Sequence, residues 1–247
     1  FPSPPADNCG TPDILEHAVL AGSRHFPVKD PFVEMLKSSM ATFINAFTCS
    51  DRTIYPVASN VTQDFFNLAA VYLDAVFHPR LSRDALMQEG WHWAVETVRG
   101  RPTLRPKGVV LNEMRGAFSD LEALVDRETA ARLFPLGTYG LDAGGEPHCI
   151  PDLTYEAFTA CYRRTYHPAH ARFFLYGDIP LVEKLRFLDE HLADVDPGGG
   201  VPPVIVRQPG WRRPRRAQVA LSGLLDDASA CAAATTISWA VGDLGDA

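Results

Sequence analysis

The sequence has no long hydrophobic run and no excess of positive charge. No stretch of its 247 residues approaches the roughly 18 uncharged apolar residues that a membrane-spanning helix needs. Lys and Arg number 23 against 30 Asp and Glu, so the formal net charge is -7. An acidic chain has no general attraction to nucleic acid or to anionic lipid. We therefore expect neither a nucleic-acid partner nor a membrane partner.

Cysteine is scarce, and no two cysteines form a C-x-x-C pair. The five are Cys9, Cys49, Cys149, Cys161 and Cys231. Their odd number and wide spacing indicate free thiols in a reducing compartment rather than a disulfide framework. The chain also lacks an initial Met, since it begins with Phe1, and it shows no signal peptide or transit segment. We interpret it as a chain that has lost a leader or as a piece of a longer protein.

The residues that are present have the composition of a globular protein, with 46% hydrophobic and 21% charged residues. Twenty prolines favour short, interrupted elements and argue against long coiled coils. We predict one α+β domain over residues 1–193. Residues 194–217, rich in Pro, Gly and Arg, are interpreted as a connection, and residues 218–247 as closing strands that lead toward a second domain.

Hydrophobic periodicity predicts helices that alternate with short strands. A first helix is expected after an N-cap at Thr11, and further helices over residues 31–40, 62–77, 109–118, 122–134, 154–166 and 181–192. Strands are expected over residues 42–49, 53–58, 91–98, 172–176, 218–222 and 235–241, the first two as a hairpin. Because strands occur both in hairpins and between helices, we predict an α+β fold with a mixed, mostly antiparallel sheet and helices packed on it.

One short segment carries the residue types of a metal site. Asp13 and His17 are four residues apart and share a helix face, with Glu16 beside them, and Glu113 lies 96 residues after His17 on a second predicted helix. Zinc accepts imidazole nitrogen and carboxylate oxygen, and a catalytic site adds a carboxylate that takes a proton from water. The alternative is structural, because Asp13 and Glu16 also suit the first turns of any helix.

Other polar clusters have simpler interpretations. His148, His167 and His170 lie near one another in the sequence without a recognisable ligand spacing, and we interpret them as ordinary histidines. The basic run at residues 211–216 has the composition of a nucleic-acid or nuclear-import segment. Because the chain is acidic overall and strands are expected nearby, a solvated connection is the favoured interpretation of this run.

The segment from Asp13 to His17 resembles the inverted zinc motif H-x-x-E-H of the inverzincins. Longer stretches are similar to the presequence-protease branch of the pitrilysin–insulysin zinc metallopeptidases. These stretches include GTPDILEHAVLAGSRHFPVKDPF, TFINAFTCSDRTIYPVAS, DFFNLAAVYLDAVFHPRL, QEGWHW, GVVLNEMRG, GGEPHCIPDLTYEAF and TYHPAHARFFLYGD. They follow the family's order from about residue 5 to residue 180.

The resemblance implies a fold and a set of partners. Members of the family contain four related α+β domains in two halves that enclose a chamber, and this chain corresponds to the first domain. The remaining domains and short unstructured peptides are therefore the expected partners. Relatives are found in the mitochondrial matrix, in plastids or in the cytoplasm, and these are the compartments expected for this chain.

The resemblance also assigns roles to individual residues. His17 matches the second histidine ligand of one zinc ion, Glu16 the general base and Glu113 the third ligand. Asp13 stands where the family has its first histidine ligand. Because the Asp side chain is shorter and negatively charged, we expect zinc binding to be altered and peptidase activity to be impaired.

The resemblance further places a peptide-binding strand at Asn45, Ala46, Phe47 and Thr48, which match the family's N-A-x-T pattern. Such a strand binds an extended peptide through main-chain hydrogen bonds at a sheet edge. The expected function is thus a zinc metalloendopeptidase module that cleaves short unstructured peptides. The alternatives are a catalytically silent homologue that binds peptides or serves as a structural subunit, and an artefactual substitution at Asp13.

Overall fold

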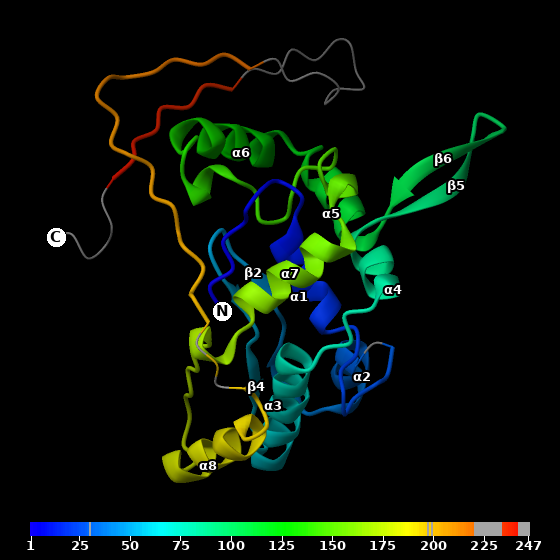
Figure 1. The fold of residues 1–247 in the computed structure, drawn as a ribbon, viewed down its shortest axis with the longest axis vertical. Helices are drawn as coiled ribbons and strands as arrows, with labels where there is room; N and C mark the ends of the chain where they lie inside the picture. Colours follow the sequence, from blue (N-terminus) through cyan, green and yellow to red (C-terminus); the bar gives the residue numbers. More distant parts are fainter. Residues whose placement is uncertain (30, 197, 199, 220–233, 242–247) are drawn as a thin grey trace.

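The computed structural model describes all residues except 30, 197, 199, 220–233 and 242–247. Helices and short strands alternate along the chain (Figure 1). The helices are α1 (Thr11–Val19), α2 (Pro31–Ser38), α3 (Thr62–Phe77), α4 (Arg83–Ala85), α5 (Val109–Ala117), α6 (Leu121–Leu133), α7 (Tyr155–Thr165) and α8 (Leu181–Leu192). The strands are β1 (Ala41–Ile44), β2 (Phe47–Thr48), β3 (Thr53–Ile54), β4 (Val57–Ser59), β5 (His92–Val98) and β6 (Arg101–Lys107). Short helical turns cover η1 (Leu86–Gly90), η2 (Thr138–Gly140), η3 (Ile150–Asp152) and η4 (Pro168–His170).

The α+β class is confirmed, but the strands are arranged differently from the prediction. The described strands form three two-stranded antiparallel sheets, β1–β4, β2–β3 and β5–β6, in place of one mixed sheet. The hairpin predicted around residues 50–52 is present, with Phe47 opposite Ile54 and Thr48 opposite Thr53. The predicted strand 42–49 is interrupted between β1 and β2. Pro56 lies opposite this break and accepts a hydrogen bond from the Asn45 amide, but it has no N–H to return.

Strand prediction was wrong at residues 172–176 and 235–241, which form no strand. Of the strand predicted at 218–222, residues 218–219 are irregular and the rest lies outside the described residues. Strand β6 was missed because its two prolines hide the alternation of its side chains. Proline is tolerated there because a two-stranded hairpin has an outer edge on both strands, where an N–H is not needed for pairing.

Helix prediction was closer. Helices α3 and α8 have the predicted bounds, and α2, α5, α6 and α7 agree to within two residues at each end, whereas the three-residue helix α4 was not predicted. The first helix is the exception at its cap, because Gly10 and not Thr11 occupies the N-cap position. Gly10 has a left-handed backbone with φ 69°, and a Cβ there would lie 2.3 Å from the Gly144 carbonyl oxygen. Only glycine fits this close approach, so the helix begins with Thr11 in its first turn.

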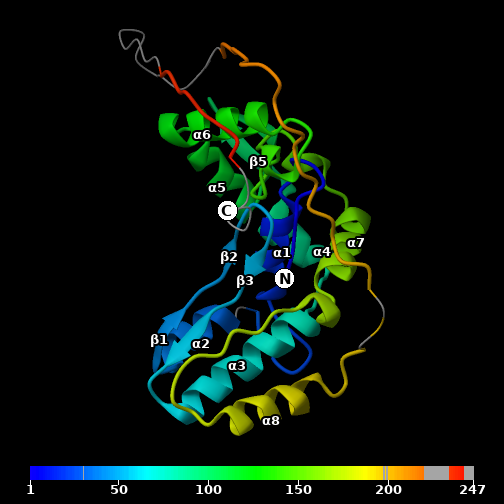
Figure 2. The ribbon, with the colours of Figure 1, turned by 90° about the vertical axis from the view of Figure 1, so that its left-hand side faces the viewer.

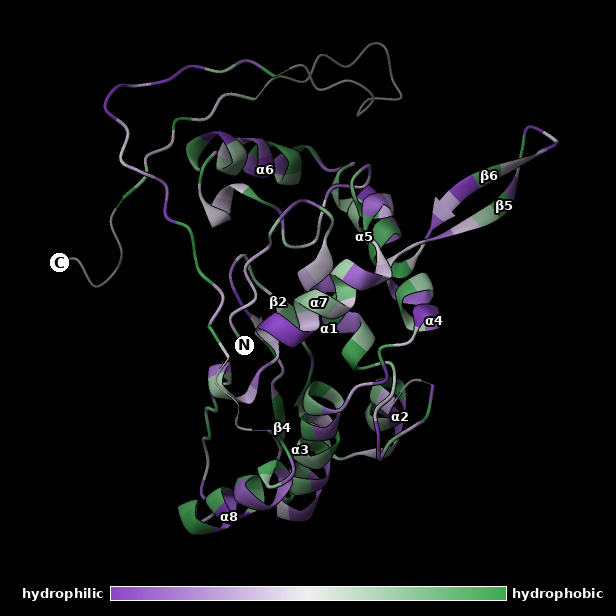
Figure 3. Cartoon of the chain, viewed as in Figure 1, coloured by the Kyte–Doolittle hydropathy of each residue, from purple (hydrophilic) through white to green (hydrophobic). Residues whose placement is uncertain are grey.

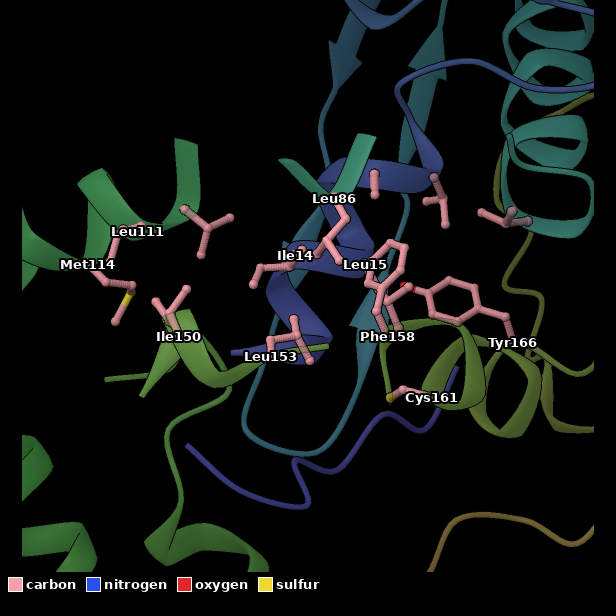
Figure 4. Packing of buried hydrophobic residues seen from close by; sticks show 14 residues of the cluster. Ile14, Leu15, Leu86, Leu111, Met114, Ile150, Leu153, Phe158, Cys161 and Tyr166 are labelled. Atoms are coloured by element: carbon pink, nitrogen blue, oxygen red, sulfur yellow. The ribbon is translucent and has the colours of Figure 1, made fainter. Parts of the chain in front are cut away.

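Helix α1 is the centre of the main hydrophobic core. Its residues Ile14, Leu15, Ala18 and Val19 are fully buried. Figure 4 shows Ile14 and Leu15 among side chains from α5, from α7 and from the turn before α7. Full burial of each large aliphatic side chain contributes about 1.5–3 kcal/mol, so this face holds the helix firmly in place.

A second, smaller cluster lies under α3. Leu68 and Tyr72 of α3 and Met35 of α2 are its buried members, and the β1–β4 sheet covers them. Helix α8 packs beside α3, as both ribbon views show (Figures 1 and 2). This layer supports the strands that lead into the candidate site.

Two elements stand apart from these cores. The β5–β6 hairpin projects away from the body of the molecule (Figure 1). Helix α6 has no buried residue, and its residues are mixed in hydropathy along its length (Figure 3). No helix among the described residues combines the length and apolarity needed to cross a membrane. The four cysteines in the described part of the chain are free thiols.

Candidate metal centre and peptide-binding strand

Helix α1 presents three polar side chains along one edge of its buried face. Asp13, Glu16 and His17 follow the i, i+3, i+4 spacing that places residues on the same side of a helix. Because the neighbouring apolar residues are buried, the helix cannot rotate to move this edge into solvent. Glu16 is only 9% exposed, although its side chain ends in a carboxylate.

Helix α5 brings Glu113 to the same place. Its residues Val110, Leu111 and Met114 are buried in the main core, which leaves Glu113 on the outer face. The start of α5 lies against the end of η1, since a Cβ on Gly108 would be 1.9 Å from the Gly90 carbonyl oxygen. This close approach lets α5 stand beside α1.

The three candidate ligands converge. One ligand atom each from Asp13, His17 and Glu113 lies within 4.8 Å of the others. His17 Nε2 is 3.6 Å from Glu113 Oε2. Three donors of the types that zinc accepts therefore face one point, although Glu113 lies 96 residues after His17 in sequence.

A fourth acidic residue, Glu89, was missed by sequence reasoning. It belongs to η1, a single turn of π-helix, and its Oε2 lies 3.5 Å from His17 Nδ1. A carboxylate on the second nitrogen of a ligand histidine fixes the ring orientation. The sequence did hint at a role for Glu89, because this residue lies in the QEGWHW segment that carries part of the resemblance. Nothing in its spacing, however, pointed to His17.

The predicted peptide-binding residues lie beside the acidic cluster. Thr48 on β2 donates its hydroxyl hydrogen to Glu16 Oε2 at 2.5 Å. Asn45 accepts a hydrogen bond from the Tyr72 hydroxyl through its backbone oxygen at 3.0 Å, and its side chain accepts one from the Ala46 amide. Phe47 is 40% exposed. Thr48 thus links the predicted peptide strand directly to the predicted base.

The outer edges of β1 and β2 have no partner strand in the described part of the chain, whereas residues 1–3 bond to the backbone along the outer edge of β3. Strand β1 pairs with β4 and strand β2 pairs with β3, each as a two-stranded sheet. A strand edge of this kind offers unpaired N–H and C=O groups to an extended peptide.

The carboxylates outnumber the cations at this site, and the pKa values reflect it. Burial raises the pKa of Glu16 to about 7, with a further contribution from the charge of Asp13. Burial alone lowers the pKa of His17, but Glu89, Asp13 and Glu113 outweigh it and raise that pKa to about 9. Burial also raises the pKa of Asp13. The cluster therefore favours a positive charge at its centre.

Comparison with known sequences gives the same family as the resemblance. "Presequence protease 1, chloroplastic/mitochondrial" of Arabidopsis thaliana is 51% identical over 194 residues, which cover 78% of this chain and 18% of that protein. "Presequence protease, mitochondrial" of Danio rerio is 45% identical over 220 residues, which cover 87% of this chain and 21% of that protein. This chain is a homologue of the presequence proteases. It spans about one fifth of the length of the curated relatives that it matches.

Solved structures support the fold. Pitrilysin matches with a TM-score of 0.64 at 20% identity, over 84% of this chain and 21% of that chain. The periplasmic protease PqqL of Escherichia coli matches with a TM-score of 0.64 at 16% identity, over 83% of this chain and 21% of that chain. At these identities the likeness concerns the fold alone, and it confirms the expected pitrilysin-type architecture.

A family model described as the Peptidase M16 inactive domain matches residues 152–231. The candidate site residues, from Asp13 to Glu113, all precede this match. The match also runs across the connection predicted at residues 194–217, so the division of this homologue into 1–193, 194–217 and 218–247 stays a prediction.

Proposed function

We propose that this presequence-protease homologue carries the zinc site and the peptide-binding edge of a metalloendopeptidase that acts on short unstructured peptides. The observation that carries the proposal is the convergence of Asp13, His17 and Glu113 within 4.8 Å, with Glu16 on the same helix edge. The names of the sequence relatives support a peptidase origin.

The residues fit a divalent metal in both chemistry and charge. Asp13 and Glu113 supply carboxylate oxygen and His17 supplies imidazole nitrogen, which are common zinc ligands. With Glu16 and Glu89, four carboxyl groups surround one imidazole ring. A bound dication would offset this concentration of negative charge, and Glu89 would hold the His17 ring in place.

Zinc, when bound, supplies polarisation of the scissile carbonyl and of the attacking water. Glu16 accepts the proton of that water and returns it to the leaving amine. A pKa near 7 suits this role, because the carboxyl group can take up and release a proton near neutral pH. Thr48 orients the Glu16 carboxylate through its hydroxyl. The peptide backbone pairs with the open strand edge from Asn45 to Thr48.

Asp13 at the first ligand position lowers the expected activity. A carboxylate adds negative charge next to the bound water, and this charge makes the water harder to deprotonate. The same observation favours a second candidate function, a catalytically silent homologue that binds peptides or acts as a structural subunit. Position 13 is the feature that separates the two.

The zinc site is tested by metal stoichiometry. The chain is equilibrated with Zn²⁺, and bound metal is measured by elemental analysis for wild type, His17→Ala and Glu113→Gln. Each variant is expected to lose one equivalent of zinc. Glu122→Gln, at an exposed carboxylate in the first turn of α6, is the matched control and should bind as the wild type does. Unchanged zinc content in both site variants would exclude this site.

The proposal also concerns partners and compartment. Because the chain spans about one fifth of its relatives, the partners proposed besides peptides are the further domains of a longer protein. The names of the relatives include chloroplasts and mitochondria, which are two of the three compartments expected from the sequence. We propose that the chain acts in one of these three.

A further inference from the structure

We propose a second metal site, of zinc-like preference, formed by Glu146, His148 and Cys149. One ligand atom from each of these residues lies within 4.8 Å of the others. His148 Nε2 is 3.2 Å from Glu146 Oε2. The three residues are separate from the cluster of Asp13, His17 and Glu113, and they contribute a thiol, which that cluster does not contain.

A tight turn brings the three donors together. The Cys149 amide donates to the Glu146 carbonyl oxygen at 2.8 Å, which closes a four-residue turn with Pro147 at its second position. Proline pre-sets the backbone angle that this position requires. The E-P-H-C stretch therefore presents a carboxylate, an imidazole and a thiol from one turn of chain.

The turn is anchored on one side. Asn8 donates from its side chain to Glu146 Oε1 at 2.6 Å, and the Glu146 amide donates to the Asn8 backbone oxygen at 2.8 Å. Asn8 also accepts a hydrogen bond from the Asp142 amide through its side-chain oxygen. These contacts hold one carboxylate oxygen and leave Oε2 directed at His148.

The other two donors can close on an ion. The His148 side chain is 76% exposed, so it can rotate without disturbing the core. Four-coordinate zinc has ligand bonds of about 2.0–2.3 Å, so the atoms that bind it lie well within about 4.8 Å of one another. The ligand atoms of Glu146, His148 and Cys149 already lie within 4.8 Å of one another. A small rotation of His148 and Cys149 therefore completes three ligands, and water occupies the fourth position.

The donor set selects the class of metal. Magnesium and calcium prefer oxygen ligands, whereas thiolate with imidazole favours zinc and chemically similar dications. Glu146 and His148 line a cleft of about 790 Å³ that is also lined by Thr48 and Cys49. An ion bound at the turn would place positive charge in the same cleft as the proposed peptide-binding strand.

Cobalt(II) titration tests this site separately from the first one. A thiolate ligand gives cobalt a near-ultraviolet charge-transfer absorption, and the site of Asp13, His17 and Glu113 contains no thiol. Wild type should show this absorption with about one equivalent of Co²⁺ and lose it when Zn²⁺ is added, because zinc competes for the same ligand set. His17→Ala should keep the absorption, so loss of the first site leaves this result unchanged.

Two variants and one control decide the assignment. Cys149→Ser should abolish the absorption. His148→Ala, at an exposed side chain, should weaken cobalt binding at least about tenfold. Mutation of residues that only hydrogen-bond to metal ligands already lowers metal affinity by this factor. Cys49→Ser, at a thiol that lines the same cleft as Glu146 and His148, should behave as wild type. No absorption in the wild type, or absorption that persists in Cys149→Ser, would overturn the proposal.

Discussion

At the scale of single residues, position 13 has the largest consequence for the proposed function. Burial raises the pKa of Asp13 and of Glu16; the charge of Glu113 adds to the rise for Asp13, and the charges of Asp13 and Glu113 add to the rise for Glu16. An imidazole at this position would bind the same metal without adding negative charge. The chemistry of the site therefore depends on one side chain more than on the fold around it.

Asp13→His should raise the affinity for zinc, by about tenfold or more on the scale of changes at a metal site. The physical reason is a neutral nitrogen ligand that relieves repulsion between carboxylates. Isothermal titration with Zn²⁺ measures the effect, with Cys149→Ser as the common background so that one site contributes. Equal affinities before and after the substitution would contradict the assignment of residue 13 as a ligand position.

Asp74 shows how a buried charge contributes to stability away from the site. It is 7% exposed, accepts the His25 amide at 2.7 Å and lies 2.7 Å from the His25 ring nitrogen. Burial alone raises the pKa of Asp74, but its hydrogen bonds lower it below the ordinary value. A carboxyl group whose pKa is lower in the folded protein than in the unfolded chain stabilises the fold at pH values above its unfolded pKa. This contribution is lost as the pH falls through the pKa of the folded state.

Asp74→Asn should therefore destabilise the protein by about 1–3 kcal/mol at neutral pH and by less in acid. Urea unfolding at several pH values measures the difference. Asp126→Asn, on helix α6 with no buried residue, is the control and should leave the stability unchanged. A destabilisation that stays constant from neutral to acid pH would show that the charge of Asp74 is not the cause.

At the scale of elements, the strands beside the site leave apolar side chains in solvent. Phe43 on β1 is 46% exposed and Phe47 on β2 is 40% exposed, and their rings stack with centroids 6.3 Å apart. The residues from 42 to 49 carry no charge that would discourage pairing with another strand.

The chain is therefore expected to self-associate through this edge, and an extended peptide in excess should reduce the association. Sedimentation velocity over a range of concentrations measures both effects. Phe43→Lys places a charge on the strand and should yield a monomer. A wild-type chain that is monomeric at high concentration and insensitive to peptide would mean that Asn45 to Thr48 is not the peptide-binding edge.

The β5–β6 hairpin has a strained turn. Arg99 and Gly100 connect the strands with φ angles of 49° and 75°, so both residues have the left-handed backbone of a tight two-residue turn. Gly100 adopts this conformation without cost, but an Arg does not.

Arg99→Asn should stabilise the hairpin by up to about 1 kcal/mol, because Asn tolerates the left-handed region. Amide hydrogen exchange in β5 and β6 should slow, while the Tm of the whole chain changes little because the hairpin projects from both cores. Gly100→Ala should have the opposite effect on exchange. Unchanged exchange in both variants would mean that the turn does not limit the stability of this hairpin.

At the scale of the whole molecule, the chain holds the proposed ligands, base and strand but only about one fifth of the length of its presequence-protease relatives. The side chain of Glu113 is 57% exposed, and that of His17 is 26% exposed. A metal site open to this degree does not exclude water from a bound peptide, and exclusion of water and positioning of the substrate supply much of the rate in a peptidase.

The isolated chain is therefore expected to show little peptidase activity even after Asp13→His restores a histidine ligand. Hydrolysis of a fluorogenic unstructured peptide by the zinc-loaded variant measures this. Zinc content, determined on the same sample, shows that any lack of turnover is not a lack of metal. Rapid turnover by this variant alone would mean that the chain needs no further domains for catalysis.

The sequence by itself determined the local features of this protein. The apolar spacing of α3 set its bounds, and the i, i+4 spacing placed Asp13 and His17 on one helix edge, because helical periodicity depends only on neighbouring residues. The motifs that resemble the presequence proteases identified the family for the same reason, since they are runs of adjacent residues. Local spacing also identified the hairpin turn between β2 and β3.

Only the tertiary structure decided which distant residues meet. The close approach of Gly90 and Gly108 places Glu89 and α5 beside α1, and Thr48 reaches Glu16 through the β2–β3 hairpin. The interruption opposite Pro56 and the anchoring of the Glu146 turn by Asn8 likewise depend on contacts between remote segments. Such contacts follow from packing and from backbone partners across the fold, and no periodicity within one segment encodes them.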